Sequence, residues 1–158
     1  MTKTHLYIKK FYLSLKIEAS RREMDNQNLE RILEFVASRP RYRLVVCDGN
    51  PFSNLAPLNL GYSISARIKN LQNRSELSYI APSIVDEIID DATSCIDDIG
   101  DVVILDNWGI LFEPELGLIP VDVISKHSKS KTIVVLSNKF YDNPTSGVNL
   151  SNISHLHL

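Results

Sequence analysis

Three uninterrupted runs of apolar residues limit what this chain can fold into. They occupy residues 44–47, 102–105 and 132–136. A run with no polar alternation is typical of a strand buried on both faces, as in the middle of a parallel sheet. More than a dozen residues with helical patterns separate the runs, as the crossovers between parallel strands require. The sequence therefore predicts an α/β fold, a parallel sheet with flanking helices.

Each predicted strand runs directly into polar residues. We call these polar residues at the carboxyl ends of the strands the tips: Asp48-Gly49, Asp106-Asn107 and Ser137-Asn138. The carboxyl ends of parallel strands share one edge of a sheet, where α/β proteins bind their ligands. In P-loop NTPases an acid at the end of such a strand holds the Mg²⁺ of the nucleotide. We expect the tips to lie side by side, in the places of a P-loop, a Walker B acid and a polar sensor residue.

The loop after the first strand lacks the composition of a working P-loop. Such a loop needs glycines that let backbone N–H groups cradle phosphate, a lysine for the β- and γ-phosphates and a Ser/Thr for Mg²⁺. With Ser53 in the place of the last glycine, Asn54 replaces the lysine and Leu55 the hydroxyl residue. Before Pro57 there is almost no room for a helix whose N-terminus faces the phosphates. Vestigial nucleotide contacts would come from this loop and the tips: Asp48, Gly49, Asn50, Ser53, Asn54, Asp106, Asn107, Ser137 and Asn138.

Asp106 has two interpretations that the sequence leaves open. It is the only metal ligand that the sequence indicates, and only if a magnesium nucleotide binds. An acid that ends a buried strand also often accepts backbone N–H groups of the following turn. Asn107 likewise can position a water or close that turn.

The segment beyond this tip is very apolar for a loop. It contains Trp108, Ile110, Leu111 and Phe112. These side chains can belong to the core, or they can form a surface on which a partner docks, since Trp and Phe are common interface anchors.

Several segments in a fixed order resemble a known family. They are Pro57–Arg67, Val103–Asn107, Leu111–Leu116 and Ser128–Val134, of which Leu105–Asn107 and Leu111–Pro114 are the most specific. Together they resemble the small P-loop proteins of BREX phage-defence systems, the BrxF type, over roughly residues 41–138. The resemblance implies a P-loop NTPase-like domain at 41–158. Residues 1–40 lie outside the resemblance, and their periodicity predicts an N-terminal extension with an amphipathic helix.

Members of that family carry an intact P-loop and are expected to bind ATP inside a larger defence assembly. This chain keeps the Asp106-Asn107 tip and departs from the family at the loop. We therefore expect a non-catalytic subunit, without a cofactor, that binds other protein subunits of an anti-phage complex and meets nucleic acid only indirectly. The alternative is a subunit that binds or weakly hydrolyses ATP with magnesium, with positive charge from Lys139, Arg43 or a neighbouring subunit. A third interpretation is a small-ligand pocket at the strand tips.

The composition is that of an ordinary globular protein. The net charge of −2 gives no electrostatic reason to expect nucleic acid or an anionic membrane as a direct partner. No apolar run approaches the roughly 20 residues of a membrane span, and the N-terminus has no sustained apolar stretch of a signal peptide. We expect a cytoplasmic protein with two buried thiols, Cys47 and Cys95, rather than a disulfide framework.

The remaining elements are predicted from periodicity and capping residues. Residues 4–20 fit a strand or a helical stripe equally well. The acids of the helix at 82–98 are expected on a solvated face, and His155 and His157 are expected to be exposed. The other predictions are helices at 25–38, from Ser63 onward and at 120–128, a short strand at 56–61, a loop at 141–152 and an edge strand at 154–158.

Overall fold

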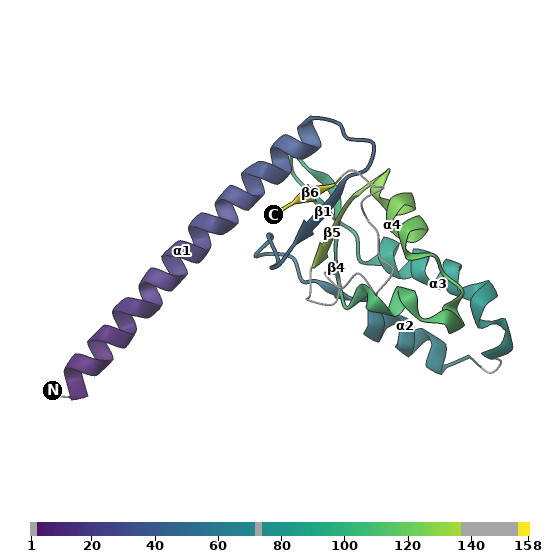
Figure 1. The fold of residues 1–158 in the computed structure, drawn as a ribbon, viewed down its shortest axis with the longest axis horizontal. Coiled ribbons are helices and arrows are strands. Elements are labelled where there is room, and N and C mark those ends of the chain that lie inside the picture. The colour runs from purple at the N-terminus through teal and green to yellow at the C-terminus, as the bar shows by residue number, and fades with distance from the viewer. Residues whose placement is uncertain (1–2, 72–73, 137–154) are drawn as a thin grey trace.

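The computed structural model describes residues 3–71, 74–136 and 155–158. A mostly parallel sheet lies at its centre, with the strand order β2-β4-β5-β1-β6, and helices lie on both of its faces (Figure 1). A further strand, β3, pairs antiparallel with β4 outside this order. The strands are β1 (Leu44–Cys47), β2 (Leu58–Asn59), β3 (Ser94–Ile96), β4 (Gly100–Asp106), β5 (Thr132–Leu136) and β6 (Leu156–His157).

The three apolar runs form the middle of the sheet, as predicted. β4 pairs with β5, and β5 pairs with β1, all in parallel. Val103 and Leu105 point to one face, whereas Val102 and Ile104 point to the other, and all four are buried. Burial on both faces explains why these runs contain no alternating polar residue.

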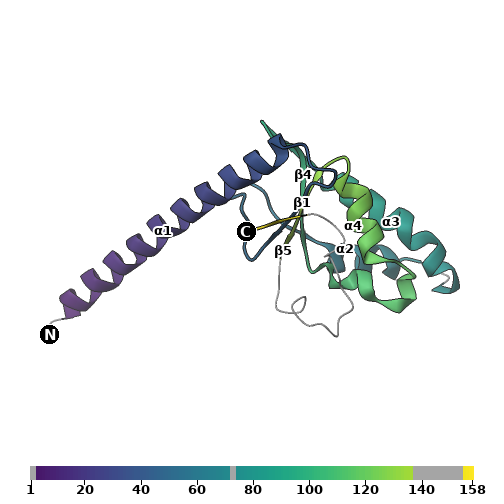
Figure 2. The same ribbon diagram turned by 45° about the horizontal axis from the view of Figure 1, so that its top comes forward.

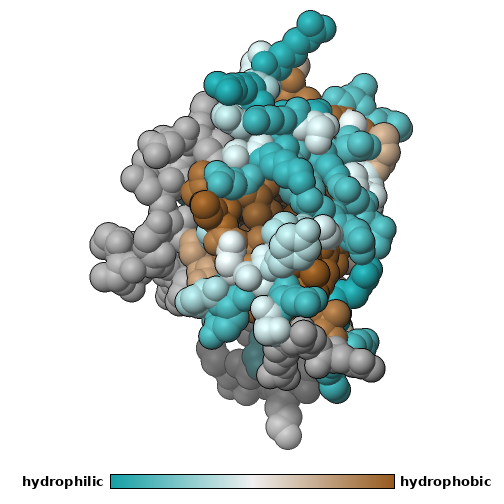
Figure 3. All heavy atoms as spheres, turned by 90° about the vertical axis from the view of Figure 1, so that its right-hand side faces the viewer, coloured by the Kyte–Doolittle hydropathy of each residue, from teal (hydrophilic) through white to brown (hydrophobic). Residues whose placement is uncertain are grey.

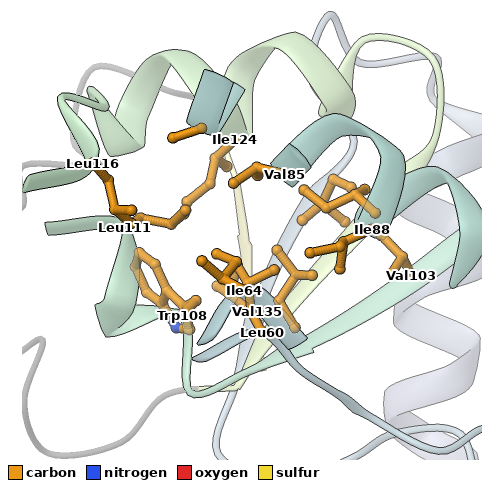
Figure 4. Packing of buried hydrophobic residues seen from close by; sticks show 14 of the residues in the cluster. Leu60, Ile64, Val85, Ile88, Val103, Trp108, Leu111, Leu116, Ile124 and Val135 are labelled. Atoms are coloured by element: carbon orange, nitrogen blue, oxygen red, sulfur yellow. The ribbon is translucent and has the colours of Figure 1, made fainter. Parts of the chain in front are cut away.

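Three helices cover one face: α2 (Leu60–Lys69), α3 (Leu77–Asp91) and α4 (Pro120–Ser128). Their apolar stripes meet the sheet in one cluster, in which Ile64, Val85 and Ile124 face Val103 and Val135 (Figure 4). On the outer side of these helices, apolar residues gather in a hollow ringed by hydrophilic ones (Figure 3).

The opposite face is covered mainly by the second half of α1 (Lys3–Ala37). Ile32 is fully buried there against Val45, Val102 and Val134, and Leu29, Leu33 and Val36 pack around it. The first half of the same helix leaves the sheet and projects away from the body, as both ribbon views show (Figures 1 and 2). Residues 4–20 are therefore helical, and the second half of the predicted extension belongs to the core.

The predicted helix at 82–98 is shifted. α3 begins at Leu77, so Pro82 lies inside it, and ends at Asp91. Cys95 and Ile96 lie instead in β3, which turns back into β4 through Asp98 (φ 68°) and Gly100 (φ 87°). The prediction was too long because the spacing of Cys95 and Ile96 continues the apolar pattern of the helix. Gly100 begins β4 and does not end a helix. Cys95 is exposed, contrary to the prediction, whereas Cys47 is buried.

α2 also begins earlier than predicted. Asn59, not Ser63, caps it, because the Asn59 Oδ1 accepts a hydrogen bond from the Tyr62 backbone N–H at 2.9 Å. α4 has its predicted bounds, and β6 adds a short parallel edge strand beside β1. The predicted loop at 141–152 lies outside the described residues. Within the described part of the chain, no helix combines the length and the apolarity needed to cross a bilayer.

Candidate functional site at the carboxyl edge of the sheet

The carboxyl ends of β1, β5 and β4 lie next to one another, because these strands are parallel neighbours. β2 adds a fourth tip, since Asn59 stands in register with Asp106. Asp48 and Asp106 thus reach the same edge, as the sequence predicts. Ser137 and Asn138 lie outside the described residues.

The β4 tip is held by polar contacts within the chain. Asp106 Oδ1 accepts a hydrogen bond from the backbone N–H of Asn107 at 2.8 Å. Asn107 has a left-handed backbone (φ 49°, ψ 38°), and its Nδ2 donates to Asn59 Oδ1 at 3.1 Å. The Asp106 carboxylate therefore closes the turn, and Asn107 ties β4 to the beginning of α2.

The loop from β1 to β2 contains no helix. Asn50 organises it: its Oδ1 accepts from the Phe52 N–H at 2.9 Å, and its Nδ2 donates to the Leu55 carbonyl at 2.7 Å. The Phe52 side chain is 4% exposed and packs into the core beneath α1. Ser53 and Asn54 remain exposed. The loop therefore folds around its own side chains and uses the Phe52 N–H internally, so this group cannot cradle a phosphate.

A hollow of about 360 Å³ opens beside this loop, between the β1 tip and α1. No basic side chain is among the described residues that line it: Asp25, Gln27, Asn28, Cys47, Asp48, Gly49, Asn50 and Leu158. Burial, and then the neighbouring charge of Asp48, raise the pKa of the Cys47 thiol to about 12. The thiol therefore stays neutral and is not poised as a nucleophile.

Arg43, one candidate source of positive charge, does not lie at this edge. Arg43 precedes β1, so it lies at the amino end of the strand, where its guanidinium donates to the Ser130 carbonyl. Lys139 lies outside the described residues. Within those residues, no group of three or more His, Cys, Asp and Glu side chains is placed to hold a metal ion. His157 is exposed as predicted, whereas His155 is half-buried, contrary to the prediction.

The apolar tail of the β4 tip forms a 3₁₀ helix, η2 (Trp108–Phe112). Trp108 and Leu111 are at most 1% exposed and belong to the core, so their side chains are not offered to a partner. The Trp108 Nε1 donates to the Leu136 carbonyl at 3.2 Å and thereby joins the tips of β4 and β5. Ile110 and Phe112 are half-buried and pack against the same cluster.

The structure also contains a charged cluster between α3 and α4 that the sequence did not indicate. His127, 6% exposed in its side chain, contacts Asp86 through Nε2 at 2.8 Å. The Lys131 Nζ lies 2.6 Å from Asp90 Oδ1 and 3.1 Å from Thr93 Oγ1. The partners are about 40 residues apart in sequence, so no local pattern predicts them.

Asp86 also pairs with Lys126, so its carboxylate has two partners on α4. Burial by itself raises the pKa of Asp86, but the hydrogen bonds and charges of Lys126 and His127 outweigh burial and place the pKa below its ordinary value of 3.8. Two of the acids predicted on a solvated face of α3, Asp86 and Asp90, therefore join α3 to α4 and the start of β5.

The chain matches no family model, no curated protein and no solved structure. A function therefore has to be inferred from the fold and from the geometry of the sheet edge.

Proposed function

We propose that this chain is a non-catalytic, P-loop-like subunit that binds protein partners in a bacterial anti-phage defence complex. The observation that carries the proposal is the β1–β2 connection. Where a P-loop NTPase has a glycine-rich loop, a lysine and a helix, this chain has a loop held by Asn50 and anchored by buried Phe52. It offers no lysine and no helix N-terminus to a phosphate.

The order of the strands supports the P-loop part of the proposal. β5 lies between β1 and β4, which is the place of the sensor strand between the P-loop and Walker B strands of AAA-type ATPases. Asp106 ends β4 at the carboxyl edge, where a Walker B acid ends its strand. These features accord with the resemblance of residues 41–138 to the BREX family.

The charges at the edge support the non-catalytic part. Asp25 and Asp48 line the hollow beside the loop, and no described cation accompanies them there. A carboxylate about 6 Å from a phosphate charge costs roughly 3 kcal/mol at an effective dielectric constant near 20. Without a lysine to offset this repulsion, the edge disfavours a triphosphate.

Asp106→Asn separates a structural from a catalytic role. The amide oxygen of Asn still accepts the Asn107 N–H, but a neutral amide is a poor magnesium ligand. In a strain that carries the native operon, we expect the variant to retain phage protection and to co-purify with the same operon-encoded proteins as the native chain. Deletion of the gene should abolish protection.

Two results would contradict the proposal. One is loss of protection by a soluble, folded Asp106→Asn chain, which would favour the ATP-dependent alternative. The other is a tagged chain that elutes without other proteins, combined with unchanged protection after deletion of the gene.

A further inference from the structure

The N-terminal arm, defined here as residues 3–24, leaves the body as a helix with exposed apolar side chains. Phe11, Tyr12 and Leu13 are 61–67% exposed, and Leu15 and Ile17 are 48–50% exposed. Both ribbon views show the arm pointing away from the sheet (Figures 1 and 2). So much exposed apolar surface is typical of a site of association.

The arm is apolar on two opposite sides. At 3.6 residues per turn, Phe11 and Leu15 share one side, and Leu13 and Ile17 lie about 200° around the helix from them. A helix that rests on a membrane surface has one apolar side and one charged side. The two-sided pattern therefore favours contact with protein over contact with a membrane surface.

The charge of the arm is opposite to that of the rest of the chain. The arm contains six Lys and Arg residues and two Glu residues, whereas the rest of the chain contains 11 basic and 17 acidic residues. Two arms would therefore repel each other, but one arm is attracted to the remainder of a second copy. Electrostatic complementarity of this kind fixes orientation and partner choice.

An apolar recess on the body offers a matching surface. It lies where β2 and β3 flank the same side of β4, has a volume of about 340 Å³, and is lined by residues that include Leu55, Pro57, Leu58 and Ala92. A second hollow of about 510 Å³ shares Leu58 and Ala92 with it.

Acids stand at the margin of this surface. Asp91 lines the second hollow, and its side chain is 76% exposed although Arg67 lies 3.6 Å away. Asp101 is exposed on β4, opposite Cys95 of β3. An arm of 22 residues is about 33 Å long, comparable with the diameter of a small domain, so it can cross such a surface.

We propose that the arm of one copy docks on the β2–β3 edge of a second copy, so that the chain self-associates through its arms. The inference goes beyond the proposed function, because it concerns assembly of the purified chain with itself and requires neither nucleotide nor another protein.

The exposed Cys95 next to the recess makes the contact testable. Ser14→Cys in the arm and Ser38→Cys at the end of α1 are matched variants, because each serine is exposed and donates its hydroxyl to the carbonyl three residues earlier. With a short bis-maleimide, we expect Ser14→Cys to form covalent dimers and Ser38→Cys to stay at the level of the native chain. Adding Cys95→Ser to Ser14→Cys should abolish the dimer.

Light scattering during size-exclusion chromatography provides the second readout. The full chain should be dimeric, with a dissociation constant that rises about tenfold between 50 and 500 mM NaCl as salt screens the attraction. Leu13→Asp with Ile17→Asp should give a monomer with an unchanged denaturation midpoint. A monomeric native chain at 100 µM would overturn the proposal. The proposal would also be overturned if Ser14→Cys still formed covalent dimers after Cys95→Ser was added. A monomeric chain that bound anionic vesicles through its arm would overturn it as well.

Discussion

Asp86 joins α3 to α4 through its contacts with Lys126 and His127. Replacing it with Ala leaves the Nε2 of buried His127 without its carboxylate partner. We expect the free energy of unfolding at pH 7 to fall by about 1–2 kcal/mol, because an unsatisfied buried polar group costs that much. Urea denaturation measures the change. Glu115→Gln, the control at an exposed acid, should change stability by less than about 0.5 kcal/mol.

The same carboxylate predicts a pH dependence. The pKa of Asp86 in the folded chain is lowered. Its contribution to the free energy of unfolding is therefore complete above the pKa of the unfolded chain and is lost as the pH falls through the folded pKa. The native chain should lose this contribution below about pH 4. Asp86→Asn should be less stable at pH 7, and the difference from the native chain should shrink toward pH 3. An equal difference at both pH values would show that the charge is not responsible.

Gly61 marks the close approach of α2 to the β4 tip. A Cβ at this position would lie 2.4 Å from the Asn107 Nδ2 and 3.3 Å from the Asn107 carbonyl oxygen. Gly61→Ala should therefore destabilise the fold by about 1–3 kcal/mol, although Ala favours helix. Gly49→Ala is the matched control, since no atom lies within 4 Å of its Cβ position. Adding Asn107→Gly should recover part of the loss, and a strictly additive double mutant would argue against this contact.

At the scale of elements, the β1–β2 loop replaces a helix and is held mainly by Phe52. Phe52→Ala should lower the free energy of unfolding by about 3 kcal/mol, because it leaves a cavity beneath α1. The adjacent Ser53→Ala, at an exposed position, should have almost no effect. If both variants were neutral in urea denaturation, the loop would not be anchored as described.

Patterns in the sequence predicted the central strands well and the ends of other elements poorly. Burial on both faces requires uninterrupted apolar runs, so β1, β4 and β5 were recognisable. The end of α3 was not, because Cys95 continues its apolar spacing and the reversal depends on positive φ at Asp98 and Gly100. The Asp86–His127 contact was equally hidden, since only the tertiary fold joins residues 41 positions apart.

The candidate site was predicted in part. The parallel neighbours bring Asp48 and Asp106 to one edge, and the missing helix after β1 was evident from Pro57. The roles of individual side chains were not evident. Trp108 lies in the core, and Asn107 holds α2 through Asn59, because both contacts depend on how η2 and α2 pack.

At the scale of the whole molecule, the carboxyl edge of the sheet is where α/β proteins bind ligands. Among the described residues, however, no basic side chain lies there to bind phosphate. The arm of α1 and the apolar hollow on the outer side of α2, α3 and α4 are exposed surfaces suited to association with other proteins (Figures 1 and 3). The central claim is therefore that the chain acts by binding proteins and not by turning over nucleotide.

Calorimetric titration of the full chain with Mg²⁺ and ATP tests this claim most directly. We predict no saturable heat up to millimolar ATP, and the same trace for Asp106→Asn. Saturable binding by the native chain that Asp106→Asn abolishes, with the variant still folded, would contradict the claim and assign the carboxyl edge to a working nucleotide site.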